Sequence, residues 1–130
     1  MEKLPELGKI HPDFFNRVIY PRLGKKDKSV MVGPQHGVDF GVIDLGDEVM
    51  VLSADPFYIA KELGMEKAAW FAVHILASDV AVSGIAQKYL AVDLNLPPEI
   101  TEDELTRMWD TVHKECKKLG IAVVTGHTAR

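Results

Sequence analysis

Residues 89–96, YLAVDLNL, alternate between two kinds of side chain. The three leucines and Val92 fall on one face, and Ala91, Asp93 and Asn95 fall on the other. Because successive side chains of a strand point to opposite faces, this pattern predicts a half-exposed β-strand. The two prolines that follow it end the strand.

A helix and a second strand are predicted after this strand. Thr101 precedes Glu104 by three residues, which is the signature of a capping box at a helix N-terminus. Apolar residues then recur at helical spacing until Gly120, a natural C-terminal stop. They are Leu105, Met108, Trp109, Val112, Cys116 and Leu119. Residues 121–125 predict a final strand, and Gly126-His127-Thr128 is expected to form a glycine loop after it.

The segments before residue 89 predict a long helix and a hairpin. Residues 67–83 are apolar on nearly every side, which predicts a helix buried on most of its faces. Residues 40–43 and 49–53 predict two strands. The connection between them contains Gly46-Asp47, and a short connection of this kind indicates a hairpin.

The N-terminal part adds a short helix and a short strand. Residues 30–32 predict the strand, and four apolar residues predict an amphipathic helix that ends at Pro21 and Gly24. These four are Phe14, Phe15, Val18 and Ile19. The complete order, without an internal repeat, is typical of an α+β domain with a mostly antiparallel sheet and helices on one face.

Composition limits the class of protein. A chain of 130 residues is long enough for one domain, 1-130, with a hydrophobic core. Its net charge of -4 argues against nucleic acid as the main partner, because phosphates are bound by basic faces. The longest apolar stretch, residues 68–82, is short for a membrane span and contains Asp79. The single cysteine, Cys116, excludes an internal disulfide and, without a secretory signal, favours a cytoplasmic protein.

Three aspartates follow or interrupt apolar segments: Asp39, Asp55 and Asp79. A carboxylate in apolar surroundings is costly unless it is paired, hydrogen-bonded or bound to a metal. Mg²⁺ on the phosphates of a nucleotide needs one or two such carboxylates. The alternatives are structural: Ser83 or backbone N–H groups could satisfy Asp79, Asp55 could cap a turn before Pro56, and Asp39 could be a loop residue.

Glycines at the expected element boundaries form a second group of candidates. Four glycines could each supply backbone N–H groups to a phosphate, or each could only make a turn: Gly33, Gly37, Gly84 and Gly126. His36 and His127 lie beside such glycines and are candidates for ligand contact. Neither a dinucleotide-binding glycine motif nor a Walker loop is present.

Three further residues are expected to belong to the core. His74 lies in the apolar helix and is expected to be a satisfied core histidine. Trp70 and Trp109 lie on apolar helical faces and are expected to be buried. A nucleophile of the Ser-His-Asp or Cys-His type is not supported by the spacing of the residues.

The order of four motifs resembles the aminoimidazole ribotide (AIR) synthase-related superfamily. The motifs are residues 33–39, residues 52–57, residues 77–84 and residues 124–128, and the resemblance extends from about Gly8 to Arg130. The stretches at residues 55–57 and 79–84 are most similar to the hydrogenase-maturation dehydratase branch and its archaeal-type relatives.

The resemblance implies a fold, a cofactor and a site. The fold would be a four-stranded sheet that pairs in a homodimer to form an eight-stranded barrel, with ATP and Mg²⁺ in a groove beside it. The metal ligands would be Asp39, Asp55 and Asp79. The ATP-binding residues would be Gly37, Gly84, Gly126, His127 and Thr128. The γ-phosphate would pass to a substrate oxygen, often that of an amide or carboxamide, by positioning and charge neutralisation.

Departures from the family pattern leave an alternative function open. Many relatives have aspartate in place of Val38, and several have it in place of His127, while asparagine is common in place of Ser78. The alternative is therefore a dimerisation, scaffold or nucleotide-sensing module without catalysis. The family's C-terminal domain is expected to be absent from this chain, so that full turnover would need a part that these 130 residues do not supply.

Overall fold

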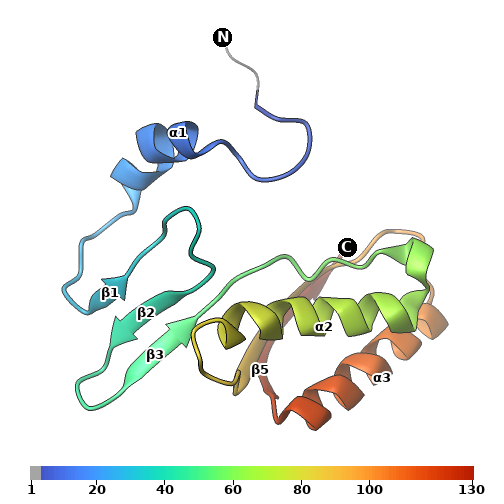
Figure 1. Cartoon of the computed structure of the whole chain (residues 1–130). Coiled ribbons are helices and arrows are strands. Elements are labelled where there is room, and N and C mark those ends of the chain that lie inside the picture. The colour runs from blue at the N-terminus through green and yellow to red at the C-terminus, as the bar shows by residue number, and fades with distance from the viewer. Residues whose placement is uncertain (1–3) are drawn as a thin grey trace. The chain divides into compact units, whose positions relative to one another are not determined.

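The computed structural model describes residues 4–130 and shows an α+β protein (Figure 1). The chain divides into two compact units, Met1–Leu52 and Ser53–Arg130. Each unit has its own sheet. Within the described residues, no helix is both long enough and apolar enough to cross a membrane.

The first unit begins with a short, irregular helical segment. Its three turns are α1 (Pro12–Phe14), the π-helical η1 (Phe15–Ile19) and the 3-10 helix η2 (Tyr20–Arg22). The predicted short helix is thus present, but it changes type along its length. Pro21 lacks a backbone N–H and cannot continue the α-helical hydrogen bonding, which agrees with the change to a 3-10 turn.

A three-stranded antiparallel sheet completes the first unit. Its strands β1 (Val30–Val32), β2 (Gly41–Asp44) and β3 (Val49–Leu52) lie in the order β1-β2-β3. The predicted hairpin is confirmed, since Gly41 pairs with Leu52 and Asp44 pairs with Val49. In its turn, Gly46 donates its backbone N–H to Asp44 Oδ1 at 2.8 Å and adopts a φ of +94°. Glycine adopts this conformation without the steric cost that a side chain would add.

The second unit contains a parallel strand pair and two long helices. Its elements are η3 (Lys61–Leu63), α2 (Met65–Ala81), β4 (Tyr89–Asn95), α3 (Glu102–Leu119) and β5 (Ala122–Ala129). The predicted strand at residues 89–96 is confirmed, with Leu90, Val92 and Leu94 buried. Helix α3 carries the capping box of Thr101 and Glu104 and ends at Gly120 in the left-handed conformation.

The described residues do not form the predicted four-stranded, mostly antiparallel sheet. They form the three-stranded antiparallel sheet and, separately, a two-stranded sheet in which β4 and β5 are parallel. The connection explains the direction of β5. Helix α3 lies between β4 and β5 in the sequence. It brings the chain back to the end at which β4 begins, so that β5 runs parallel to β4, as in β-α-β units.

The core of the second unit lies between the two helices and the β4–β5 sheet. The three buried side chains of β4 meet Ala69, Val73 and Leu76 of α2 and Met108 and Val112 of α3. Met108 and Val112 are fully buried. Complete burial of such side chains contributes about 1.5–3 kcal/mol each, so this helix–sheet contact stabilises the second unit.

The expectation that α2 is buried on most sides is wrong. Trp70, Phe71 and Ile75 are exposed on one face of α2, with 41% of Trp70 accessible. Trp109 of α3 is also partly exposed, so neither tryptophan is a fully buried core residue. An all-round apolar sequence cannot show which helix face meets the core, and here one face of α2 packs against β4 and α3.

Candidate functional site

A hydrogen bond joins two of the chemically suggestive segments within the second unit. Ser53 directly follows β3, and its Oγ donates to Asp79 Oδ2 across 3.5 Å. Both residues are partly buried, and they are 26 positions apart in the sequence. Ser83, which the sequence suggested as a partner for Asp79, instead donates to the carbonyl oxygen of Val80 at 2.6 Å. The carboxylate of Asp79 therefore lies within long hydrogen-bond distance of the segment that leaves β3.

Asp55 lies two residues beyond Ser53 and is exposed. A tight turn follows it, in which the Tyr58 N–H donates to the Pro56 carbonyl oxygen at 2.8 Å. Across residues 4–130, no group of three or more His, Cys, Asp or Glu side chains could by itself hold a metal ion. A cation bound by Asp55 or Asp79 would therefore take further oxygen ligands from water or from a bound phosphate, as Mg²⁺ commonly does.

Asp39 belongs to the first unit, in the loop between β1 and β2. Its carboxylate lies 3.6 Å from the ammonium of Lys9, and 44% of its side chain is exposed. Gly37 precedes it with a φ of +79°, which a residue with a side chain rarely adopts. His36 packs edge-on against the ring of Phe15, with centroids 5.0 Å apart. These residues make a loop in which the Asp39 carboxylate already has a cationic neighbour.

Gly84 and the Gly126-His127-Thr128 segment have different backbone roles. Gly84 follows α2 and donates its N–H to Ala81 at 2.9 Å, so this N–H closes a turn at the end of the helix. The prediction of a loop at residues 126–128 is wrong, because β5 continues through these residues. Gly126 pairs with Val92, His127 with Asp93, and Thr128 with Leu94.

Close approach of the two strands explains why a glycine occurs inside β5. A Cβ atom on Gly126 would overlap the carbonyl oxygen of Val92 on β4. In the sequence, Gly126 looked like a breaker of the strand, whereas it permits the pairing to continue. Gly126 and Thr128 also line a shallow hollow of about 250 Å³ beside Trp109, together with Val123.

Every candidate ATP-binding and metal-binding residue lies within one family match. Residues 37–130 match the sequence profile of the AIR synthase related protein, N-terminal domain. The chain belongs to this family. No curated protein gives a significant match to the chain. The match extends over the last part of the first unit and all of the second, so the family assignment includes both sheets in part or in whole.

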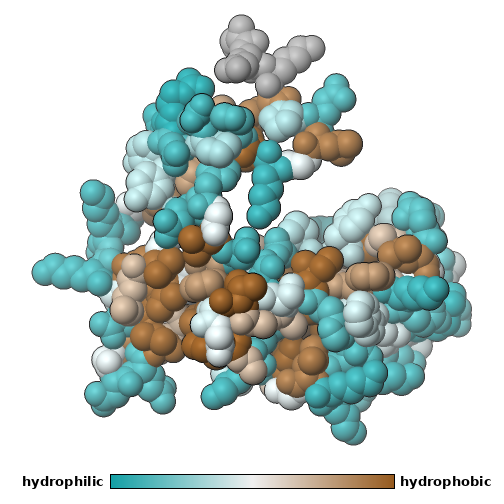
Figure 2. Space-filling model, in the orientation of Figure 1, coloured by the Kyte–Doolittle hydropathy of each residue, from teal (hydrophilic) through white to brown (hydrophobic). Residues whose placement is uncertain are grey.

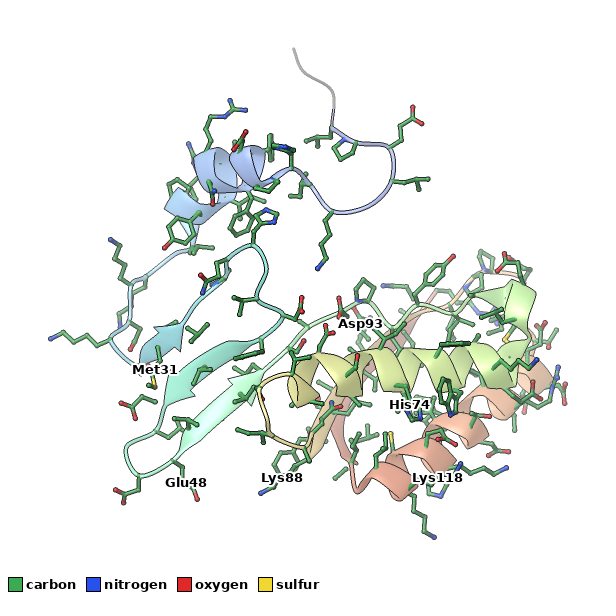
Figure 3. The ribbon with its side chains drawn as sticks, viewed as in Figure 1. Met31, Glu48, His74, Lys88, Asp93 and Lys118 are labelled. Carbon is green, nitrogen blue, oxygen red and sulfur yellow. The ribbon has the colours of Figure 1, made fainter. Side chains whose placement is uncertain are left out.

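This AIR synthase-related domain also contains a polar network that the sequence did not reveal. Glu115 of α3 is buried and accepts hydrogen bonds from Lys118 Nζ at 2.6 Å and from His74 Nε2 of α2 at 3.1 Å. Figure 3 shows His74 on α2 and Lys118 on α3. The expected core histidine is therefore satisfied by a carboxylate, although 31% of its side chain is exposed.

The two hydrogen bonds favour the charged form of Glu115. They lower the pKa of Glu115, with Lys118 the larger cause and His74 the second. The ring of His74 also stacks on Trp70, with centroids 4.0 Å apart. The sequence held one signal of this arrangement: Glu115 falls beside Val112 and Cys116 on the apolar stripe of α3, where an isolated charge requires a partner.

Proposed function

We propose that this AIR synthase-related domain binds ATP with Mg²⁺ and forms the nucleotide-binding part of an enzyme that activates a substrate oxygen. The observation that supports it most is the hydrogen bond between Ser53 and Asp79. This bond joins the segment that carries Asp55 to the helix that carries Asp79. A partly buried carboxylate with a hydroxyl group beside it is a suitable ligand for a hard cation.

The donor chemistry of the second unit fits Mg²⁺ on a nucleotide. Asp55 and Asp79 offer carboxylate oxygens, and Mg²⁺ bound to phosphates needs one or two of them. Bound Mg²⁺ would neutralise charge on the phosphates during transfer of the terminal phosphoryl group. Asp79 and Asp55 would hold the cation in this arrangement, and the role of Asp39 as a metal ligand stays a prediction from the sequence.

The proposed reaction is phosphorylation of an amide or carboxamide oxygen, which turns that oxygen into a leaving group. Resemblance of residues 55–57 and 79–84 to the hydrogenase-maturation branch supports this acceptor class. Of the proposed ATP-binding residues, Gly37 and Gly84 adopt turn conformations, and Gly126, His127 and Thr128 lie in β5. In the proposal, the latter three contact the nucleotide through exposed atoms of the strand.

A second candidate function is a self-associating scaffold without catalysis. It is favoured by apolar side chains on the three-stranded sheet, where Met31, Val49, Met50 and Leu52 are exposed. Figure 2 shows hydrophobic residues gathered over this sheet. It is also favoured by β5, whose backbone pairs with β4 at residues 126–128 instead of forming a phosphate-binding loop. Both candidate functions include a homodimer.

Calorimetric titration with Mg-ATP tests the proposed function. The wild-type chain is expected to bind ATP only when Mg²⁺ is present, and Asp79→Asn is expected to lose this binding because the amide removes the charge. Asp110→Asn is the matched control, since Asp110 is an exposed aspartate of α3 outside the proposed site. Absence of Mg-ATP binding by a folded wild-type chain would refute the nucleotide proposal and favour the scaffold.

A further inference from the structure

The hydroxyl of Ser53 is the starting point for a more specific inference. Three serines lie close to Asp79 in sequence or in space: Ser53, Ser78 and Ser83. Ser78 donates to the carbonyl oxygen of Ile75 at 2.7 Å, and Ser83 donates to that of Val80 at 2.6 Å. Both therefore hydrogen-bond to the backbone of their own helical segment. Ser53 differs, because its hydroxyl reaches from outside the helix to the Asp79 carboxylate.

The position of Asp79 makes such a contact consequential. Asp79 lies near the C-terminal end of α2, where the negative end of the helix dipole disfavours a carboxylate. At 3.5 Å the Ser53 hydroxyl is at the long limit of a hydrogen bond, so it compensates a small part of that cost and favours one orientation of the carboxylate. The same contact ties the segment that carries Asp55 to α2, because Ser53 and Asp55 are two residues apart.

We infer that Ser53 is a positioning residue, whose hydroxyl orients the Asp79 carboxylate for the divalent cation that accompanies the nucleotide. The inference rests on the proposed function and adds a residue outside the three aspartates. Ser53 does not itself bind the cation in this role. Partners that orient a metal ligand typically contribute about 10- to 100-fold to metal affinity, so removal of the hydroxyl has a measurable effect.

The test is a titration of Mg²⁺ at a fixed, saturating concentration of ATP, with nucleotide binding followed by calorimetry. Ser53→Ala is expected to raise the Mg²⁺ concentration needed for half-maximal binding by about tenfold. Ser53→Thr retains the hydroxyl and is expected to restore binding to near the wild-type level. Ser83→Ala is the matched control, because it removes a hydroxyl that donates to the carbonyl oxygen of Val80 at the end of the helix.

Thermal melting of the same variants without ligand separates positioning from folding. Ser53→Ala is expected to melt close to the wild type and still need more Mg²⁺. Equal Mg²⁺ requirements for Ser53→Ala and wild type would overturn the inference and leave the proposed function intact. If Ser53→Thr bound as weakly as Ser53→Ala, the inference would also be overturned, because loss of the hydroxyl would not explain the weaker binding. A folded wild type that binds no Mg-ATP would overturn both proposals.

Discussion

Gly126 lies where β5 closely approaches the backbone of β4. A Cβ atom at this position would overlap the carbonyl oxygen of Val92, which belongs to the backbone and cannot rotate away. At Gly33, by contrast, an added Cβ would meet only a methyl group of Val30 at 3.6 Å, an ordinary contact distance. The two glycines therefore respond differently to the same substitution.

Gly126→Ala is expected to destabilise the protein, because β4 and β5 must move apart to admit the methyl group. Overpacking of this kind costs about 1–3 kcal/mol, which urea denaturation can measure. Gly33→Ala serves as the control and is expected to change the free energy of unfolding by much less. Equal effects of the two substitutions would contradict the close approach at Val92.

Glu115 makes stability depend on pH through its hydrogen bonds to Lys118 and His74. These bonds lower its pKa in the folded protein. A carboxyl group with a lowered pKa stabilises the folded state above its unfolded pKa of about 4.3, and this contribution is lost as the pH falls through the folded value. Glu115→Gln is therefore expected to be less stable than wild type at pH 7, with a difference that narrows in acid.

Urea denaturation at a series of pH values measures this difference. Glu6→Gln provides the comparison, since Glu6 is an exposed glutamate outside the network. If the difference in unfolding free energy between wild type and Glu115→Gln stayed constant down to acid pH, the carboxylate form of Glu115 would not be what stabilises the fold.

Single residues also show what sequence reasoning could and could not find. Asp55 and Asp79 were recognisable as candidates because a carboxylate beside an apolar segment is costly unless it is paired, hydrogen-bonded or bound to a metal. The contact between Ser53 and Asp79 was not predictable, since the two residues are 26 positions apart and the contact depends on how the chain leaves β3. Gly126 was misread because a glycine can break a strand or permit a close approach, and only the neighbouring strand decides between them.

The elements were predictable where local chemistry determines them. Helix α3 begins at a capping box and ends at Gly120, both visible in the sequence, and β4 follows from its alternating side chains. The extent of β5 was not predictable, because residues 126–128 become a strand through pairing with β4. The exposed face of α2 was missed for a similar reason, since the partner surfaces determine which face is buried.

The capping box of α3 provides a test at the scale of an element. The Glu104 N–H donates to Thr101 Oγ1 at 3.2 Å, and the Thr101 N–H donates to Glu104 Oε2 at 2.9 Å. Thr101→Ala removes the cap and is expected to cost about 0.5–2 kcal/mol in denaturation followed by circular dichroism. Thr106→Ala is the control, because its hydroxyl donates to the Glu102 carbonyl oxygen within the helix. A control that lost as much stability as Thr101→Ala would argue against the cap.

At the scale of the whole molecule, the exposed apolar residues of β3 bear on self-association. Strand β3 is at the edge of the β1-β2-β3 sheet, and Met50 is exposed on it. Charged side chains on an edge strand oppose pairing with another chain. In the proposed homodimer, Met50→Lys is therefore expected to shift the mass in solution from dimer towards monomer, as measured by sedimentation.

Leu7→Lys is the control for this experiment, because Leu7 is an exposed apolar residue outside the sheets. A dimer whose mass is unchanged by Met50→Lys would indicate that self-association uses another surface. A wild-type chain that sediments as a monomer at micromolar concentration would refute the proposed homodimer.

The crossover between β4 and β5 has a consequence for the order of folding. Strands β2 and β3 are joined by a short turn, and this pairing can form soon after that turn closes. Strands β4 and β5 meet only after the chain has passed through all of α3. Contacts between residues far apart in the chain form slowly, because a longer loop must close first. During refolding, amide protons of β4 and β5 should therefore gain protection later than those of β2 and β3.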